Sequence, residues 1–494
     1  MYALPVLILF IGLLLEGLNT ALSAPQNENV LADALAAVST DRMLADIRTL
    51  SGPEFRGRQA GTEDDLRSAT WVAEQFRTSG LSPAAIIDRV TGKGISHLGA
   101  AGLMTSVLSA PRIDPDPVLR IGPADGLHAT QLGAEYLPIL DAPSVDVQAP
   151  IVFVGYGNAE DYAGIDAGNA VVLFLRGKPD HATASLSHAD KVRLARAHGA
   201  LAYLTAAGPV LNAYELRRGL TGIPSAFYAQ MPMADALPGA WISTPLAAAI
   251  LAGRDGAQSG RLRELQEHLN STSTARSVRT DAYALLRWKT TAQDGLLTNA
   301  LALIPGTGPD TIVVGAHRDH LGRTAGLLFP GADDNASGTA VVLEVSRVLA
   351  KSGWRPARTI VFVSFSGEEK DLLGSRLYVS RPPAPLTSTA AMINIDHAGI
   401  GNGRLTVGIT GLDKQPAQEA GRASGLADKL DLFGFFPGGD HVPFKEAGVP
   451  TVTIVSGGVH PHFHQPTDSA DTMDPAILRS AAQFALALIW QLAN

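Results

Sequence analysis

The fold is decided by the stretch "TIVVGA", Thr311 to Ala316, a short and nearly continuous apolar run. Runs of this kind are typical of strands that are covered on both faces. Three more follow along the chain: "TIVFVSF" (Thr359 to Phe365), "AAMINI" (Ala390 to Ile395) and "VPTVTIV" (Val449 to Val455). Helical patterns alternate with them, most clearly "TAVVLEVSRVLA" (Thr339 to Ala350) and "AILRSAAQFALALIWQLA" (Ala476 to Ala493). The alternation predicts an α/β fold with a mostly parallel, helix-covered mixed sheet.

A second kind of sequence texture begins near Pro111 and predicts a separate, β-rich domain. Short β-rich runs alternate there with Gly, Asp and Pro turns, and 494 residues allow two or three domains. We expect strands in "APIVFVGYG" (149–157), "AVVLFLRGK" (170–178) and "TGIPSAFYA" (221–229), and a helix followed by a strand in residues 188–206. The expected domains are 25–112, an insertion at 113–280, and 281–494.

The N-terminal segment resembles a secretion signal. "ALPVLILFIGLLL" (Ala3 to Leu15) has the length of a signal core, and "ALSA" (Ala21 to Ala24) offers small residues for cleavage. We therefore expect a signal peptide at 1–24, a secreted or periplasmic protein, and no stable membrane insertion after cleavage. No Lys or Arg precedes the apolar run and Glu16 ends it, so an uncleaved membrane tether is the alternative.

Composition and charge exclude several kinds of partner. Lys and Arg number 39 against 47 Asp and Glu, a net charge of −8 without a long basic run. This gives no electrostatic footprint for nucleic acid or anionic lipid. The chain has no cysteine, so any zinc ligands must be His and carboxylates. The oligomeric state is left open.

Polar residues follow each of the four predicted strands, where ligands collect in such sheets. His317 and Asp319 follow the first, Glu368 and Glu369 the second, Asp396 the third, and His460, His462 and His464 the fourth. A single acid in a loop is usually solvated or a helix cap. Four such strand ends on one sheet edge predict a functional site.

The segment "GADDNASG", Gly331 to Gly338, falls between the first strand and its helix and allows two interpretations. From Asp333 its spacing nearly fits a calcium loop, but that motif needs a helix on both sides. The preceding "LGRTAGLLFPGA" contains three Gly and one Pro, which break an entering helix. We therefore favour a catalytic zinc ligand.

His and carboxylate ligands suit two zinc ions, which need one carboxylate to bridge them. Asp334 is the candidate bridge. His317 and Asp396 would complete one site, and Glu369 and His464 the other. Asp319 is expected to accept the second imidazole N–H of His317, unless it is a surface acid. Glu368 would then take a proton from water as Glu369 binds metal, although "GEE" also fits the acidic start of a helix.

Six motifs in this part of the chain resemble, in letters and in order, those of the secreted di-zinc aminopeptidase family, which has glutamate carboxypeptidase and glutaminyl cyclase relatives. They are "GAHRDHLG", "GADDNASGTA", "SFSGEEKDLLGS", "NIDHAG", "DHVPFKEAGVPT" and "HFHQPTDSADTMD", within residues 296–474. The resemblance implies the same five ligands, two Zn²⁺ ions, Glu368 as general base, and a cis peptide between Asp334 and Asn335. Residues from about 113 to 280 resemble the protease-associated domain that some members carry.

One residue departs from the family pattern. Relatives often have Tyr before the last ligand His, whereas this chain has Phe463 and lacks that hydroxyl. His462 or the second zinc is expected to stabilise the oxyanion instead. The nearby residues His320, His397, His441 and His460 are interpreted as supporting or pocket residues.

The expected protein is a secreted di-zinc aminopeptidase that acts on peptide substrates. A carboxypeptidase on acidic peptides and a glutaminyl cyclase are the alternatives within the same family. A metal-free binding protein is the alternative outside enzymes, because a fold can outlive its catalytic function.

Overall fold

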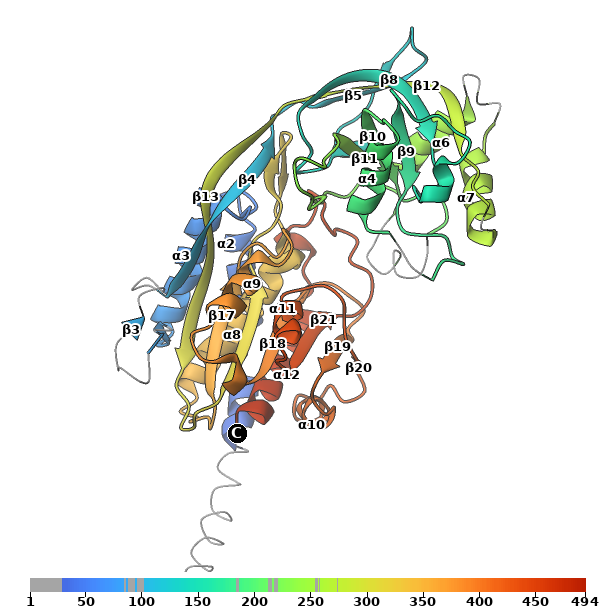
Figure 1. Cartoon of the computed structure of the whole chain (residues 1–494). Helices are drawn as coiled ribbons and strands as arrows, with labels where there is room; N and C mark the ends of the chain where they lie inside the picture. The colour runs from blue at the N-terminus through green and yellow to red at the C-terminus, as the bar shows by residue number, and fades with distance from the viewer. Residues whose placement is uncertain are drawn as a thin grey trace, which may run out of the picture.

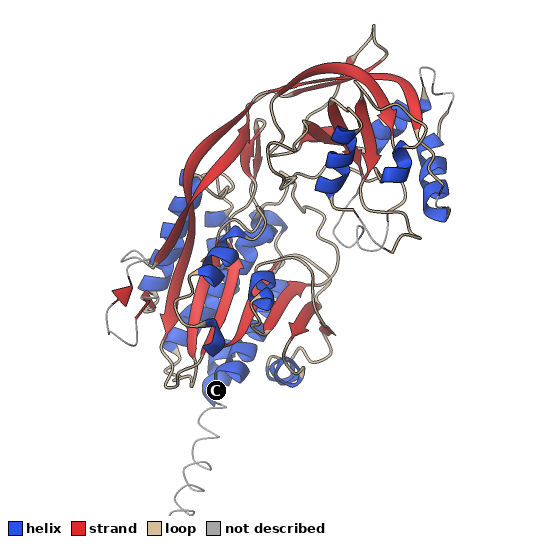
Figure 2. Cartoon of the chain, viewed as in Figure 1, coloured by secondary structure: helices blue, strands red, loops and turns tan. Residues whose placement is uncertain are grey.

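The computed structural model describes residues 29–83, 86–87, 94–95, 102–183, 186–211, 216, 221–253, 256, 258–272 and 274–494. They form two lobes, each built around its own sheet (Figures 1 and 2). The expected signal peptide at 1–24 lies outside the described residues.

The first lobe is built on a nine-stranded sheet. Its order is β1-β13-β17-β14-β18-β21-β19-β20, and β4 also pairs with β13. The strands are β1 (Ser82–Pro83), β4 (Leu103–Ile113), β13 (Thr290–Ile304), β14 (Thr311–His317), β17 (Thr359–Phe365), β18 (Thr389–Asp396), β19 (Leu405–Thr410), β20 (Leu430–Phe433) and β21 (Thr451–Ser456). The central strands β17, β14, β18 and β21 are parallel, and antiparallel pairs flank them. The expected fold class, a helix-covered mixed sheet, is confirmed.

Helices cover both faces of this sheet and explain its continuous apolar runs. The helices are α2 (Thr40–Leu50), α3 (Glu63–Thr78), α8 (Gly338–Lys351), α9 (Leu373–Ser380), α10 (Gln415–Ala423), α11 (His441–Glu446) and α12 (Pro475–Ala493). On β14, Ile312 and Val314 enter the core under α2, α8 and α12, whereas Val313 enters the opposite core with Phe444 of α11. Every position of the strand is therefore buried.

The last helix, α12, begins at a cap that the sequence encodes. The Asp474 carboxylate accepts the N–H of Ala476 at 2.8 Å, and Pro475 occupies the first turn, where it needs no N–H partner. Among the described residues α12 is the one helix long and apolar enough to cross a membrane. Most of it is buried in the first lobe, as is usual for a core helix.

The second lobe has an eight-stranded sheet and a hydrophobic core of its own. The order is β6-β5-β12-β8-β9-β10-β11-β7. The strands are β5 (Val118–Gly122), β6 (His128–Ala129), β7 (Tyr136–Pro138), β8 (Val145–Phe153), β9 (Val171–Leu175), β10 (Ala202–Ala206), β11 (Gly239–Ile242) and β12 (Val278–Trp288), with helices α4 (His188–Ala197), α6 (Thr244–Ala252) and α7 (Arg261–Ser271). Its interpretation as a protease-associated domain with boundaries 113–280 stays a prediction.

Two long strands join the lobes (Figure 1). Strands β4 and β13 pair antiparallel from Leu103 opposite Ala300 to Ile113 opposite Thr290. At the far end of this arm the chain enters the second sheet through β5 and β12. The connection is therefore a hydrogen-bonded ribbon.

The expected strand at 221–229 is wrong. Residues 224–230 form no strand. Their backbone groups form hydrogen bonds with the Asp141 carboxylate and with a loop of the first lobe instead of with a neighbouring strand. The other strands and helices expected in the second lobe are present as β8, β9, α4 and β10.

Candidate metal centre

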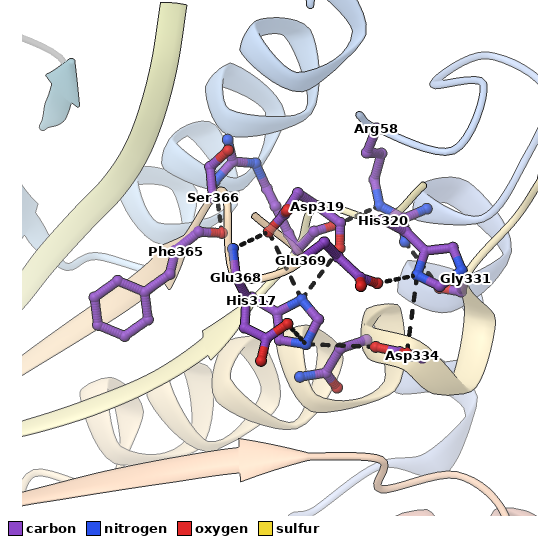
Figure 3. A network of polar contacts seen from close by, with 12 residues as sticks. Arg58, His317, Asp319, His320, Gly331, Asp334, Phe365, Ser366, Glu368 and Glu369 are labelled. Atoms are coloured by element: carbon purple, nitrogen blue, oxygen red, sulfur yellow. Dashed lines mark hydrogen bonds and ion pairs between the residues drawn. The ribbon is translucent and has the colours of Figure 1, made fainter. Parts of the chain in front are cut away.

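The predicted site residues meet at the carboxyl edge of the central sheet. Figure 3 shows five of them: His317, Asp319, Asp334, Glu368 and Glu369. His317 is the last residue of β14 and Asp396 the last of β18. Glu368 and Glu369 follow β17 directly, and Asp334 lies in the turn Ala332–Ser337 that leads into α8. Strands β15 (Gly322–Thr324) and β16 (Leu327–Phe329) precede this turn in place of a helix, so an EF-hand is excluded.

One group of potential ligands combines His317, Asp334 and Asp396. The Nε2 atom of His317 lies 3.4 Å from Oδ1 of Asp334 and 3.4 Å from Oδ1 of Asp396. One donor atom from each residue falls within 4.8 Å of the others, which allows a common ion. The peptide bond between Asp334 and Asn335 is cis, as the family resemblance implied.

A second group lies on the other side of Asp334. The Nε2 atom of His464 is 3.1 Å from Oδ2 of Asp334 and 3.2 Å from Oε2 of Glu369. Nδ1 of His320 is 2.8 Å from Oε1 of Glu369 and 4.0 Å from Oδ2 of Asp334. The two oxygens of Asp334 thus face different groups, as a bridging carboxylate requires. Sequence reasoning placed His320 only in a supporting role, whereas the structure offers it as a further donor.

The charges and unsatisfied atoms of the site fit cations. Oε1 of Glu369 and Oδ1 of Asp396 are buried and accept no well-formed hydrogen bond among the described residues; they face the imidazole nitrogens of His320 and His317 instead. Such a state is costly unless an ion satisfies the oxygens. Burial lowers the pKa of His464, but the carboxylates of Glu369 and Asp334 outweigh it and raise that pKa to about 10. The pKa of His317 is likewise raised, because Glu368 and Asp396 outweigh its burial. A surplus of buried carboxylate among imidazoles is the donor set that zinc uses.

Glu368 faces the same space but is not part of either ligand group. Its Oε2 lies 4.0 Å from Nε2 of His317, and its carboxylate lines the cavity. Burial raises the pKa of the Glu368 carboxyl well above its usual value, and the charge of His317 opposes that rise. A carboxyl with a raised pKa beside a metal site suits proton transfer.

Asp319 supports His317 and the backbone of Glu368 through different atoms. Nδ1 of His317 lies 3.1 Å from the backbone carbonyl oxygen of Asp319 and 3.7 Å from its carboxylate Oδ1. That Oδ1 accepts the backbone N–H of Glu368 at 3.3 Å. The carbonyl, rather than the expected carboxylate, is therefore the closer acceptor for the imidazole, and the carboxylate holds the Glu368 loop.

Two buried arginines that sequence reasoning missed hold the ligand loops. Arg58 donates to the carbonyl oxygens of Arg318, Pro330 and Gly331, next to His317 and just before the Asp334 turn. Burial lowers its pKa to about 10, which leaves it charged at neutral pH. Arg318 forms a fully buried ion pair with Asp65. The partners of Arg58 are backbone carbonyl oxygens, which every residue has, so no pattern of residues in the sequence predicts these contacts.

Asp333 organises two of the histidines that were expected to be supporting residues. Its Oδ2 lies 2.6 Å from Nδ1 of His460 and 3.3 Å from Nδ1 of His397. Its Oδ1 accepts the N–H of Gly399 at 2.9 Å. His397 also approaches the adjacent acid, with Nε2 3.7 Å from Oδ2 of Asp334, so its ring lies between Asp333 and Asp334.

Phe463, the residue that departs from the family pattern, stacks on His464 with ring centroids 3.8 Å apart. The expected substitute donor His462 bonds Thr467 through Nδ1 at 2.9 Å. Described residues that line the cavity include His397 and His460 but not His462. His462 is therefore not placed to replace the missing hydroxyl.

A cavity of about 560 Å³ opens over the site. The first lobe contributes the ligands, Phe436 and Phe463, and the second lobe contributes Phe227, Tyr228 and Gln230. The cavity is thus walled by both lobes, and its volume is in the range of small-molecule and peptide-end binding sites.

Comparisons with known proteins point to one family. Residues 299–489 match the model of peptidase family M28. A probable leucine aminopeptidase of Arthroderma otae is 31% identical over 205 residues, which cover 39% of this chain and 57% of the relative. An aminopeptidase of Bacillus subtilis is 32% identical over 195 residues, 37% of this chain and 41% of the relative. The match thus spans less than two thirds of either relative.

The likeness of fold extends over both lobes. An aminopeptidase structure from Aneurinibacillus sp. strain AM-1 superposes with a TM-score of 0.65 at 21% identity, over 94% of this chain and 96% of that one. A peptidase M28 precursor from Shewanella amazonensis gives a TM-score of 0.68 at 17% identity, over 95% and 97%. The family match covers residues 299–489, whereas the likeness of fold covers both lobes.

Proposed function

We propose that the protein is a zinc aminopeptidase that uses two zinc ions to remove N-terminal residues from peptides. One observation carries the proposal: within the M28 segment, imidazoles and carboxylates from four separate strand ends converge on the two oxygens of Asp334. The names of the relatives, which are aminopeptidases, support the choice of activity.

His317 and Asp396 would hold one ion, Glu369 and His464 the other, and Asp334 would bridge them. His464 is preferred to His320 because it lines the cavity, whereas the His320 side chain is fully buried behind Glu369. When bound, the two ions supply Lewis-acid polarisation of the substrate carbonyl and lower the pKa of water.

Glu368 would act as the general base and then as the general acid. Its carboxylate lines the cavity beside His317 without belonging to a ligand group, so it is free to accept a proton and return it to the leaving amine. Asp319 would hold the Glu368 backbone in place through the 3.3 Å hydrogen bond.

The test compares peptides with free and blocked ends. We expect purified protein to release N-terminal residues from free-amine peptides, to leave N-acetylated peptides intact, and to lose activity with a chelator and regain it with zinc. Cleavage of N-acetylated but not free-amine peptides would favour a carboxypeptidase. Ammonia release from N-terminal Gln without shortening would favour a cyclase, and chelator-resistant hydrolysis would contradict the metal mechanism.

We also propose that the protein is secreted. The support is the apolar run Ala3–Leu15 followed by the small residues Ala21–Ala24. N-terminal sequencing of protein from the culture medium should begin after Ala24. Retention of the whole chain in the membrane fraction would favour the tether instead.

A further inference from the structure

The segment at residues 224–230 belongs to the second lobe in sequence but lies against the metal centre of the first. It is the segment expected to be a strand. It runs between an anchor on the second lobe and two loops of the first lobe, and three of its side chains, Phe227, Tyr228 and Gln230, line the cavity.

The second-lobe anchor is Asp141. Its two carboxylate oxygens accept the backbone N–H groups of Ala229 at 2.7 Å and Gln230 at 3.0 Å. The N–H of Leu140 donates to the carbonyl oxygen of Phe227 at 3.0 Å. Asp141 therefore fixes the end of the segment without lining the cavity or touching a ligand.

The contacts with the first lobe end on two proposed zinc ligands. Nδ1 of His464 lies 2.7 Å from the carbonyl oxygen of Ala226, and the N–H of Ala226 donates to the carbonyl of His464 at 3.2 Å. The amide of Gln230 donates to the carbonyl oxygen of Glu369 at 3.2 Å. The segment thus contacts both proposed ligands of the second ion, and within the described part of the chain it forms no hydrogen bond with His317 or Asp396.

Two side-chain bonds on either side of His464 reinforce the contact. Ser225 Oγ donates to the carbonyl of Phe463 at 3.0 Å, and the amide of Gln465 donates to the carbonyl of Pro224 at 2.9 Å. His464 has a positive φ of 55°, which is uncommon outside glycine and persists where neighbours enforce it.

The Ala226 contact also selects the state of the imidazole. A carbonyl oxygen can only accept, so Nδ1 of His464 must carry a hydrogen. In the neutral ring Nε2 then carries the lone pair, and Nε2 is the atom that faces Asp334 and Glu369. This is the tautomer that a metal needs, and the partner of the other ring nitrogen is what sets it.

We propose that the 224–230 segment makes the second lobe a working part of the metal centre. It orients His464 and sets its tautomer, so zinc affinity at the Glu369–His464 site depends on the contact between the lobes. The inference rests on the proposed zinc function. Asp141, Ser225 and Gln465 are its positioning residues.

The experiment compares Asp141→Asn and the uncharged double variant Ser225→Ala/Gln465→Ala with Asp161→Ala. Asp161 is a matched control: it is a buried carboxylate of the second lobe that also accepts two backbone N–H groups, those of Tyr156 and Asn158, far from the metal centre in sequence and contacts. Circular dichroism and thermal denaturation first establish that each variant is folded.

Zinc affinity is then measured on the full-length, metal-free protein by competition with a chromogenic chelator. We expect one of the two bound ions to lose about 10- to 100-fold in affinity in both positioning variants, as for other partners of ligand histidines, and both affinities to be unchanged in Asp161→Ala. A second readout needs no metal: ¹⁵N-histidine NMR of the apoprotein, with His464 assigned by His464→Gln, should show a slowly exchanging Nδ1–H of His464, hydrogen-bonded to Ala226, in the wild type and a faster-exchanging one in the variants.

The results separate the two proposals. A wild type that binds no zinc contradicts the proposed function. A wild type that binds two ions, with positioning variants that match it in affinity and in the exchange of the His464 Nδ1–H, overturns the inference alone. If Asp141→Asn does not fold, the double variant Ser225→Ala/Gln465→Ala still tests the inference separately from the proposed function.

Discussion

The two halves of the metal centre are held in different ways. His317 and Asp396 end the adjacent strands β14 and β18, whose register sets Gly315 level with Asn394 and so places the two side chains together. Glu369 and His464 lie on loops, and the second lobe contacts both through Gln230 and Ala226. We call His317 and Asp396 the strand-end half, because the hydrogen bonds of the sheet fix their positions. Glu369 and His464 are the loop half, whose positions depend on contacts from the second lobe.

The largest expected effect comes from removing the residue that both halves share. Asp334→Ala takes away the only carboxylate that faces both ligand groups among the described residues. We expect neither ion to be retained and the peptidase rate to fall to that of the chelated wild type. The measurements are zinc content by mass spectrometry and the rate of peptide hydrolysis. Retention of two ions with the activity of the wild type would contradict the bridging role of Asp334.

Glu368→Gln separates proton transfer, which needs the Glu368 carboxylate, from zinc binding, which does not need it. Gln keeps the shape but cannot take a proton, so kcat should fall about 10²- to 10⁴-fold. Zinc content should stay that of the wild type because Glu368 belongs to neither ligand group. Steady-state kinetics and metal analysis on the same sample test this prediction. A variant with the kcat of the wild type would contradict the role of Glu368 as general base.

The strand-end half also depends on a buried ion pair. Arg318 follows His317 and pairs with Asp65, and both side chains are fully buried. Arg318→Met leaves the Asp65 carboxylate without its partner, which should cost about 3–5 kcal/mol. Urea denaturation followed by tryptophan fluorescence measures the loss.

The matched control is Arg77→Met, which breaks the exposed pair with Glu74 on α3. We expect its unfolding midpoint to stay near that of the wild type because exposed pairs contribute little. Equal shifts in the two variants would contradict the importance given to the buried pair.

The smallest effect is expected from the extra histidine of the loop half. His320→Ala should weaken zinc binding about 10- to 100-fold, as loss of a supporting partner of Glu369 does. His464→Ala should instead abolish one of the two ions. If His320→Ala loses an ion and His464→Ala keeps both, the two histidines exchange roles.

Much of the strand-end half could be predicted from the sequence. Continuous apolar runs predicted the strands, and because parallel strands end at one edge, His317 and Asp396 were expected at the same edge of the sheet. The same argument placed Glu369 and His464 after two further strands, and the six motifs pointed to the same residues, but neither showed how they are held.

The support of the loop half could not be predicted, for a physical reason. The acceptor for His464 is a backbone carbonyl 238 positions away, and every residue has such a carbonyl. Within residues 221–229 the run from Ala226 to Ala229 is apolar and β-rich, and Gly222 and Pro224 precede it, which is also the pattern of a short buried strand. The carbonyl partners of Arg58 escaped for the same reason.

The most direct test of the central claim is a zinc titration of the metal-free protein, with bound zinc and the rate of N-terminal residue release measured at each point. The account predicts two ions per chain at saturation and full activity only when both are bound. Full activity without zinc, or saturation at a single ion, would contradict it.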